Sequence, residues 1–258
     1  MDLELVGKVV LITGGTDGLG LALAQRLVAE GAAVAVCGRD EERLAEAEAV
    51  LSTAGGEVLA IRADVEHAAD ITRLVDGAAD RWGRIDGIVH NAGRSAGGNV
   101  DANDDAVWES DLRLKVMGAV RLTRTALPYL RQSRGAALFT LAVSAKAPGA
   151  GSEPSSVSRA AGMALMKALS KELGPDGIRV NAILIGLIES GQWVRMAARA
   201  GTELPALYER MAADAGIPLG RVGRAEEFAD LASFLLSARA SYLTGTAINL
   251  DGGLSPAS

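Results

Sequence analysis

The stretch KVVLITGGTDGLGLALAQRLVAEGAAVAVCGR, residues 8–39, decides the fold of this chain. It contains a short apolar run, a glycine-rich turn, a helix-length segment that ends at Gly31, and a second apolar run over 33–38. Two apolar runs joined through a helix-length segment are typical of parallel strands with a crossover helix. Residues 8–39 therefore predict one strand–helix–strand unit.

The same alternation continues along the chain. Further apolar runs lie at 58–63, 85–90, 136–142, 178–184 and 247–252, mostly separated by helix-length segments. With no repeat, low-complexity tract or long linker, this predicts one domain over 1–258, a three-layer α/β/α fold with a Rossmann-like, doubly wound, seven-stranded parallel sheet. The segment 160–173 is apolar on most of its circumference, so we expect it to pack against the sheet and against another subunit; the alternative is a helix under a long loop.

Composition excludes several classes of protein. The chain has 26 Lys and Arg against 32 Asp and Glu, a net charge of −6, so no basic surface is expected to attract nucleic acid. Asp2 and Glu4 precede the first apolar stretch, which is unlike a signal peptide, and no apolar run is long enough to span a membrane. One cysteine and two histidines argue against an internal disulfide and a metal centre. We expect a cytoplasmic protein without a membrane partner.

The glycine-rich turn TGGTDGLG, Thr13 to Gly20, stands between the first strand and the first helix. Its spacing, Gly14-x3-Gly18-x-Gly20, differs from the six-residue G-x-G-x-x-G pattern. Glycines in such a turn let the backbone approach a pyrophosphate, and the helix N-terminus offers N–H donors. The turn predicts dinucleotide contacts at Gly14, Thr16, Asp17, Gly18, Leu19 and Gly20.

Arg39 follows the second strand, where an NAD site often has an acidic residue on the ribose. An arginine there can meet the 2′-phosphate of NADP, so the sequence favours NADP(H), with NAD(H) as the alternative. Asp17 in the nearby turn would weaken such a phosphate site, and Arg39 could equally be a solvated surface charge.

Five motifs together resemble the short-chain dehydrogenase/reductase family. They are TGGTDGLG, Asp64-Val65, Asn91-Ala92-Gly93, IRVNA at 178–182 and YLTGTAINLDGG at 242–253. The resemblance covers essentially the whole chain and implies a dinucleotide at the carboxyl edge of the sheet, and usually a tetramer. It also implies cofactor contacts at Asp64, Val65, Asn91, Ala92, Gly93, Gly186, Ile188 and Ser190, with Asp64 near the adenine and Ser190 near the nicotinamide amide or the pyrophosphate.

The family's usual proton donor is missing from this chain. In the family, a tyrosine gives a proton to the carbonyl oxygen, a lysine four residues later lowers its pKa, and a serine and an asparagine assist. None of Tyr129, Tyr208 and Tyr242 is followed by a lysine at that spacing. Counting back from residues 171–181 instead puts Ser155 at the tyrosine position and Arg159 at the lysine position. The family's serine, thirteen positions before the tyrosine, falls on Ala142, and its asparagine, three residues before a glycine, falls on Lys115 before Gly118.

Other residues could supply the missing chemistry. Lys115 would become a general acid if burial lowered its pKa, and Ser144 or Lys146 could stand near the pocket. Arg159 could hold a ribose hydroxyl, or bind an anion together with Lys115. The alternative is that the loop residues are solvated and that Ser155 is only a helix N-cap.

These observations favour an NADP(H)-binding protein without ordinary carbonyl reductase activity, acting as a non-catalytic or regulatory partner of an active paralogue. The alternatives are an oxidoreductase with a non-standard proton donor, or a non-redox cyclase, dehydratase or isomerase. We expect a homo-tetramer or dimer, or a hetero-oligomer with the paralogue. The segment 187–216 is expected to form a lid over a small-molecule ligand.

Overall fold

The structure, a computed structural model, describes residues 1–257 and contains one sheet of seven parallel strands. The strand order is β3-β2-β1-β4-β5-β6-β7. The strands are β1 (Val9–Thr13), β2 (Ala33–Gly38), β3 (Val58–Arg62), β4 (Gly87–His90), β5 (Ala136–Ala142), β6 (Arg179–Ile185) and β7 (Ala247–Leu250). The predicted doubly wound, seven-stranded α/β fold is confirmed, because parallel strands buried on both faces produce the continuous apolar runs seen in the sequence.

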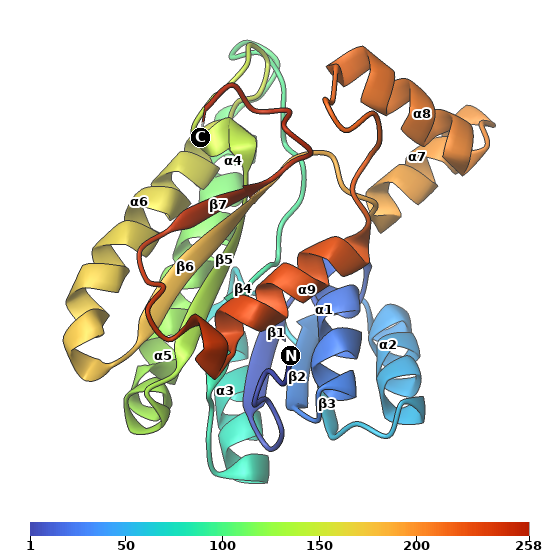
Figure 1. Ribbon diagram of the computed structural model, residues 1–258. Helices are drawn as coiled ribbons and strands as arrows, with labels where there is room; N and C mark the ends of the chain where they lie inside the picture. The colour runs from blue at the N-terminus through green and yellow to red at the C-terminus, as the bar shows by residue number, and fades with distance from the viewer. Residues whose placement is uncertain (258) are drawn as a thin grey trace.

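Helices cover both faces of the sheet (Figure 1). The helices are α1 (Gly18–Ala29), α2 (Glu41–Thr53), α3 (Ala68–Trp82), α4 (Asp105–Leu112), α5 (Gly118–Ser133), α6 (Ser155–Leu173), α7 (Gly191–Ala200), α8 (Leu204–Ala215) and α9 (Ala225–Leu236). Helices α3, α5 and α6 share a buried apolar cluster with one face of the sheet, and α1, α2 and α9 share another with the opposite face.

The first strand shows how the sequence produces two cores. Every residue of β1 is buried. Val9 and Leu11 pack into the cluster under α3 and α5, whereas Val10 and Ile12 pack into the cluster under α1 and α9. Because successive side chains of a strand point to opposite faces, a strand inside a three-layer fold must be apolar at every position.

The order of the strands also places a crevice in the sheet. Strand β1 pairs with β2 on one side and with β4 on the other. The chain therefore winds outward from β1 in both directions, and the connections after β1 and β4 diverge to opposite faces. Ligands of open α/β sheets bind in the crevice that opens there, at the carboxyl ends of the strands.

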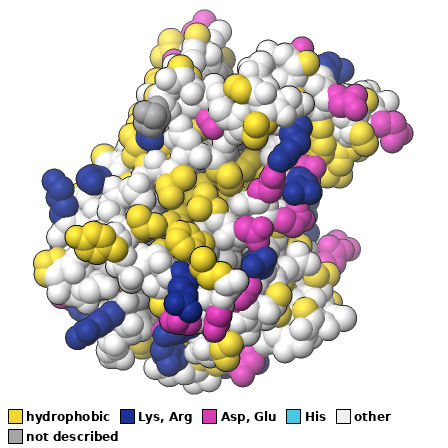
Figure 2. All heavy atoms as spheres, in the orientation of Figure 1, with side chains coloured by type: hydrophobic (Ala, Val, Ile, Leu, Met, Phe, Trp, Pro, Cys, Tyr) yellow, Lys and Arg dark blue, Asp and Glu magenta, His cyan; other side chains and the backbone are white. Residues whose placement is uncertain are grey.

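Helix α6 begins earlier than predicted and runs from Ser155 to Leu173 rather than over 160–173. Met166 and Leu173 are buried against the sheet side, while Val157, Ala164 and Ala168 are exposed on this chain. Figure 2 shows a second apolar area, in the middle of the drawn face, where Figure 1 places β7 and α9. Assembly with another subunit through any such surface stays a prediction.

Helices α7 and α8 stand apart from the sheet at one end of the molecule, within the segment 187–216 (Figure 1). They are joined to the body by β6 on one side and α9 on the other. Among residues 1–257, no helix is both long and apolar enough to cross a membrane.

Candidate functional site

The candidate site is built where β1 and β4 end. The Asn91 side-chain amide donates hydrogen bonds to the carbonyls of Thr13 and Gly14, both at 3.0 Å. The Thr13 hydroxyl accepts from the backbone N–H groups of Asn91 and Ala92, and donates to Val89 at 3.0 Å. These bonds join the glycine-rich turn to the Asn91-Ala92-Gly93 segment, so two groups of residues predicted to bind cofactor lie together.

The backbone conformation or the close packing of the glycine-rich turn requires glycine at each predicted position. Gly14 and Gly18 have positive φ angles of 65° and 51°, a region that favours glycine. A Cβ at Gly20 would collide with the Gly14 carbonyl. Helix α1 starts at Gly18, and within residues 1–257 its N-cap residue Asp17 makes no side-chain capping bond. The backbone N–H groups of the first turn are therefore left for a ligand.

The start of α7 packs on this same turn. The Asp17 carboxylate lies 3.0 Å from the Arg195 guanidinium, and Gly191 leaves no space for a Cβ beside that carboxylate. The charge of Asp17, expected to weaken a phosphate site, is thus compensated by a residue that sequence reasoning missed. Ser190 lies against Gly18, and its buried hydroxyl has no hydrogen-bond partner within the described part of the chain.

A second group of predicted cofactor residues lies at the ends of β2 and β3. The Arg39 guanidinium is 3.7 Å from the Asp64 carboxylate, and the Arg39 side chain is 63% exposed. Asp64 also accepts a hydrogen bond from the backbone of Glu66, at 3.0 Å. Thr16 packs so closely on Gly38 that a larger residue there would collide with it. Arg39, Asp64 and Thr16 therefore lie together at the carboxyl ends of β2 and β3.

Lys115 lies on a short π-helix, Arg113–Met117, inserted between α4 and α5. Its Nζ is 2.6 Å from Asp111 Oδ1 and 2.8 Å from Ser155 Oγ. The Lys115 and Asp111 side chains are 6% and 0% exposed. The hydroxyl of Ser158 donates to the other oxygen of Asp111, also at 2.6 Å. The structure thus brings two sequence candidates, Lys115 and Ser155, into contact, together with Asp111 and Ser158, which were missed.

Ser155 is not the N-cap of α6, because Pro154 holds that position and Ser155 is the first helical residue. The Ser155 hydroxyl oxygen accepts two hydrogen bonds, from Lys115 Nζ at 2.8 Å and from the Ala96 backbone N–H at 3.0 Å. Among the hydrogen bonds of residues 1–257, its own proton is donated to no group. The interpretation of Ser155 as only a cap is wrong, because the side chain turns toward Lys115 instead of the helix backbone.

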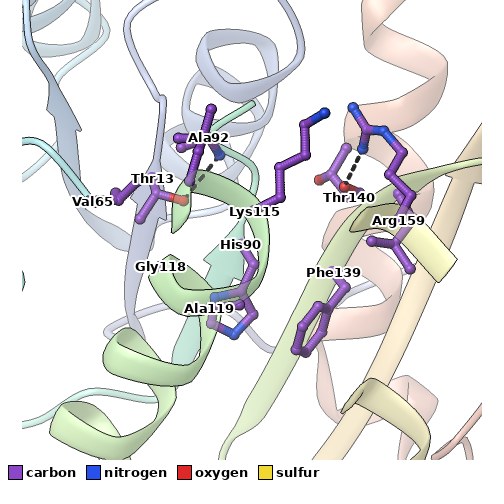
Figure 3. Close-up of a pocket in the computed structure, with 12 residues that line it drawn as sticks. Thr13, Val65, His90, Ala92, Lys115, Gly118, Ala119, Phe139, Thr140 and Arg159 are labelled. Carbon is purple, nitrogen blue, oxygen red and sulfur yellow. Dashed lines mark hydrogen bonds between the residues drawn. The ribbon is translucent and has the colours of Figure 1, made fainter. Parts of the chain in front are cut away.

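Arg159 approaches Lys115 from the opposite wall of a small cavity (Figure 3). One guanidinium nitrogen donates to the Thr140 carbonyl at 3.0 Å, and another lies beside Gly93. The cavity measures about 20 Å³, which is enough for one water molecule. It is lined by Thr13, Val65, His90, Ala92, Leu114, Lys115, Gly118, Ala119, Phe139, Thr140, Leu141 and Arg159.

The surroundings of Lys115 change its proton affinity. Burial, followed by the positive charges of Arg159 and Arg94, lowers the pKa of Lys115 to about 8, although Asp111 acts in the opposite direction. Burial also lowers the pKa of His90 to about 3, so this cavity residue is neutral at pH 7. Lys115 can therefore exchange a proton near neutral pH, as a general acid must.

The remaining candidates lie on the strand β5 side. Ala142 ends β5, and Ser144 belongs to the 3₁₀ turn Val143–Ala145. Lys146 Nζ donates to the Ala247 carbonyl at 3.1 Å and to Asn249 Oδ1 at 3.2 Å. The structure thus uses Lys146 to hold β7, not to contact Lys115 or Ser155. Gly186 packs on Asp251, just after β7, while Ile188 is buried two residues before Ser190.

The sequence contained a signal for one missed residue. Asp111 lies four positions before Lys115, the spacing at which opposite charges meet on a helix. The contacts of Ser158 and Arg195 have no such local signal, because their partners are 47 and 178 residues away.

Residues 14–255 match the family model described as enoyl-(acyl carrier protein) reductase. The rhamnolipid-biosynthesis 3-oxoacyl-[acyl-carrier-protein] reductase of Pseudomonas aeruginosa is 35% identical, over 97% of each chain. L-sorbose reductase from Gluconobacter frateurii, solved with NADPH and L-sorbose, has a TM-score of 0.94 and 32% identity over 100% of both chains.

A further similar structure is a short chain oxidoreductase from Pseudomonas aeruginosa PAO1, described as containing an atypical catalytic center. Without ligand it has a TM-score of 0.93 and 33% identity, covering 97% of this chain and 98% of that one. Its NADPH-bound form has a TM-score of 0.91 and 34% identity, covering 98% and 99%.

These relatives contradict the expectation of a non-catalytic partner subunit, because they are named as reductases and oxidoreductases and match this chain over nearly its whole length. That expectation was wrong because it equated a missing phenol with a missing proton donor. The structure instead holds Lys115 and Ser155 in direct contact. With a family model matched over residues 14–255 and full-length relatives above 30% identity, the chain belongs to the short-chain dehydrogenase/reductase family.

Proposed function

We propose that this protein is an NADP(H)-dependent oxidoreductase that reduces a carbonyl group, with Ser155 and Lys115 delivering the proton. The observation that carries the proposal is the 2.8 Å contact between Lys115 Nζ and Ser155 Oγ, beside Arg159 and next to the crevice. The named reductases among the relatives support the reaction class. In this proposal, Lys115, Ala142, Ser155 and Arg159 replace the family's four catalytic residues.

The residues of the crevice fit a dinucleotide. Helix α1 begins in the glycine-rich turn, and within residues 1–257 its N-cap Asp17 makes no side-chain capping bond, so the N–H groups of its first turn can bind a pyrophosphate. The buried Ser190 hydroxyl, which has no hydrogen-bond partner among these residues, can add a further contact. Arg39 is exposed enough to meet a 2′-phosphate, which favours NADP(H) over NAD(H). Two of the similar solved structures hold NADPH. When bound, NADPH supplies the hydride for the carbonyl carbon.

The protein's own residues supply the proton. Because Ser155 Oγ accepts from both Lys115 and the Ala96 N–H, its own O–H is free to donate to a carbonyl oxygen. As that proton leaves, the serine oxygen takes one from the Lys115 ammonium, whose pKa of about 8 allows the transfer. Lys115 recovers a proton from water. Arg159 stays charged and offers its remaining N–H donors to a ribose hydroxyl near Gly93.

The segment 187–216 covers the site in this proposal. Its helix α7 touches the glycine-rich turn through Ser190, Gly191 and Arg195, so a ligand in the crevice would lie under it. Val194 and Met196 on α7 are about half exposed. An apolar or mixed carbonyl substrate fits such a cover better than a fully charged one.

The experiment measures the loss of NADPH absorbance with a panel of ketones, aldehydes and 3-oxoacyl thioesters. Lys115→Met and Ser155→Ala should each lower kcat by ~10²–10⁴-fold, the usual effect of removing acid–base help. NADPH affinity, measured by fluorescence, should change far less. Lys171→Met, on the exposed side of the same α6, is the matched control and should behave like the wild type. Full activity in both site variants would exclude this mechanism.

A further inference from the structure

Asp111 is an unusual residue for its location. Its side chain is completely buried, on α4. A buried carboxylate is costly unless it is paired and hydrogen-bonded. Here both oxygens have close partners, Lys115 Nζ at 2.6 Å and Ser158 Oγ at 2.6 Å. The carboxylate is thus held from two sides.

Asp111, Lys115, Ser155 and Ser158 form a connected set of contacts between two helical segments. Asp111 and Lys115 are four residues apart on the α4–π-helix segment and face α6. Ser155 and Ser158 are three residues apart on α6 and face back, and residues three or four apart share a helix face. Lys115 therefore bridges Asp111 and Ser155, while Asp111 bridges Lys115 and Ser158.

Lys115 faces two positively charged side chains and one negatively charged side chain. Arg159 on α6 and Arg94 after β4 are positive, and Asp111 on α4 is negative. Arg94 itself lies 3.7 Å from Glu66, which takes up part of its charge. Without Asp111, a buried ammonium would face two guanidinium groups with no carboxylate in contact. Such a lysine would lose its proton at a lower pH than it does beside Asp111.

We propose that Asp111 is the positioning residue of this site, which keeps Lys115 protonated and holds its Nζ against Ser155 Oγ. The claim rests on the proposed function for its catalytic consequence, because a lysine without a proton cannot restore the serine hydroxyl. Ser158 supports the arrangement by fixing the second carboxylate oxygen. Asp111 touches neither cofactor nor substrate in this role and acts only through Lys115.

The direct test measures the titration of Lys115. The protein is produced with ¹³C-labelled lysine, and the Lys115 Cε resonance, identified by its loss in Lys115→Arg, is followed by NMR against pH. Asp111→Asn should lower the titration midpoint by at least about one pH unit, a tenfold change in the acid constant. An unchanged midpoint overturns the proposal. If the asparagine variant does not fold, Asp111→Ser answers the same question, because its smaller side chain leaves room for a water.

Two controls separate the effect of this carboxylate from general charge effects. Glu109→Gln removes an exposed carboxylate from the same helix, where it pairs with Arg113 at 3.1 Å. Ser158→Ala removes a hydrogen bond to Asp111 but leaves its charge. Both should leave the Lys115 midpoint close to the wild-type value, and a shift in Glu109→Gln as large as that in Asp111→Asn would overturn the proposal.

A second readout is the pH profile of carbonyl reduction. In Asp111→Asn, the fall of kcat/KM at high pH should begin at least about one pH unit lower than in the wild type. Asp111→Glu, which keeps the charge, should restore the wild-type midpoint. A purely structural role would lower the rate at an unchanged midpoint. If no carbonyl is reduced by the wild type, the proposed function fails, whereas the NMR titration still decides the role of Asp111.

Discussion

Removing Lys115 alone should destabilise the protein strongly, and removing Asp111 with it should not. In Lys115→Met, the fully buried Asp111 carboxylate keeps only the Ser158 hydroxyl as a partner. Breaking a buried pair by deleting one partner costs about 3–5 kcal/mol, a large part of the ~5–15 kcal/mol that stabilises a typical domain. At about 2–4 °C per kcal/mol, the melting temperature should fall by roughly 6–20 °C.

The double variant Asp111→Leu/Lys115→Met removes both buried charges. Replacing a buried pair with apolar residues of similar volume is often neutral, or stabilising by about 1–4 kcal/mol. Ser158 would not lose all its partners, because its hydroxyl also lies 3.0 Å from the Ser155 carbonyl. The double variant should therefore be at least as stable as the wild type, although it should have no reductase activity.

The assay is urea denaturation followed by tryptophan fluorescence at pH 7. The matched control is the exposed pair Glu109 and Arg113, which has the same four-residue spacing on the same segment, with side chains 67% and 48% exposed. Its double-mutant cycle should give a coupling of only about 0.3–0.5 kcal/mol. If the double variant loses as much free energy of unfolding as Asp111→Leu and Lys115→Met lose together, the two buried charges are not coupled and the reasoning is refuted.

Three further predictions follow from single residues. The kcat/KM for carbonyl reduction should fall about tenfold per pH unit above pH 8, because Lys115 loses its proton there. The contribution of Lys115 to the free energy of unfolding should instead rise between pH 8 and 10.5, because in this range only the unfolded state keeps that proton. A flat stability curve in Lys115→Met over this range checks the assignment. Arg39→Met should weaken NADPH binding by about 10- to 100-fold, the usual value of a charge-assisted hydrogen bond, and leave NADH binding unchanged, as fluorescence titration of both cofactors would measure. Equal losses for the two cofactors would contradict a role at the 2′-phosphate. Gly20→Ala should abolish NADPH binding in the same titration, because its Cβ would collide with the Gly14 carbonyl, while Gly149→Ala, which meets open space, should bind normally.

The sequence by itself determined the layers, the strands and the place of the crevice. Two of the seven predicted strand runs, 33–38 and 136–142, coincide with observed strands, and the other five differ from theirs by only one or two residues at one or both ends. This worked because a strand buried on both faces must be apolar throughout, and because glycines at Gly14, Gly18 and Gly20 have a local conformational cause. The apolar strand runs and the glycine-rich turn are both local features, which can be recognised from residues close together in the sequence.

The chemistry of the site was decided only by the tertiary structure. Lys115 and Ser155 are 40 residues apart, and Asp111 and Ser158 are 47 apart, so no local pattern shows that they touch. The packing of α4 and the π-helix against α6 makes these contacts, and the same packing removes the water that would keep the pKa of Lys115 near its ordinary value. The sequence shows that no tyrosine is followed by a lysine four residues later, but whether another group could give a proton depended on burial and contact, which only the folded chain creates.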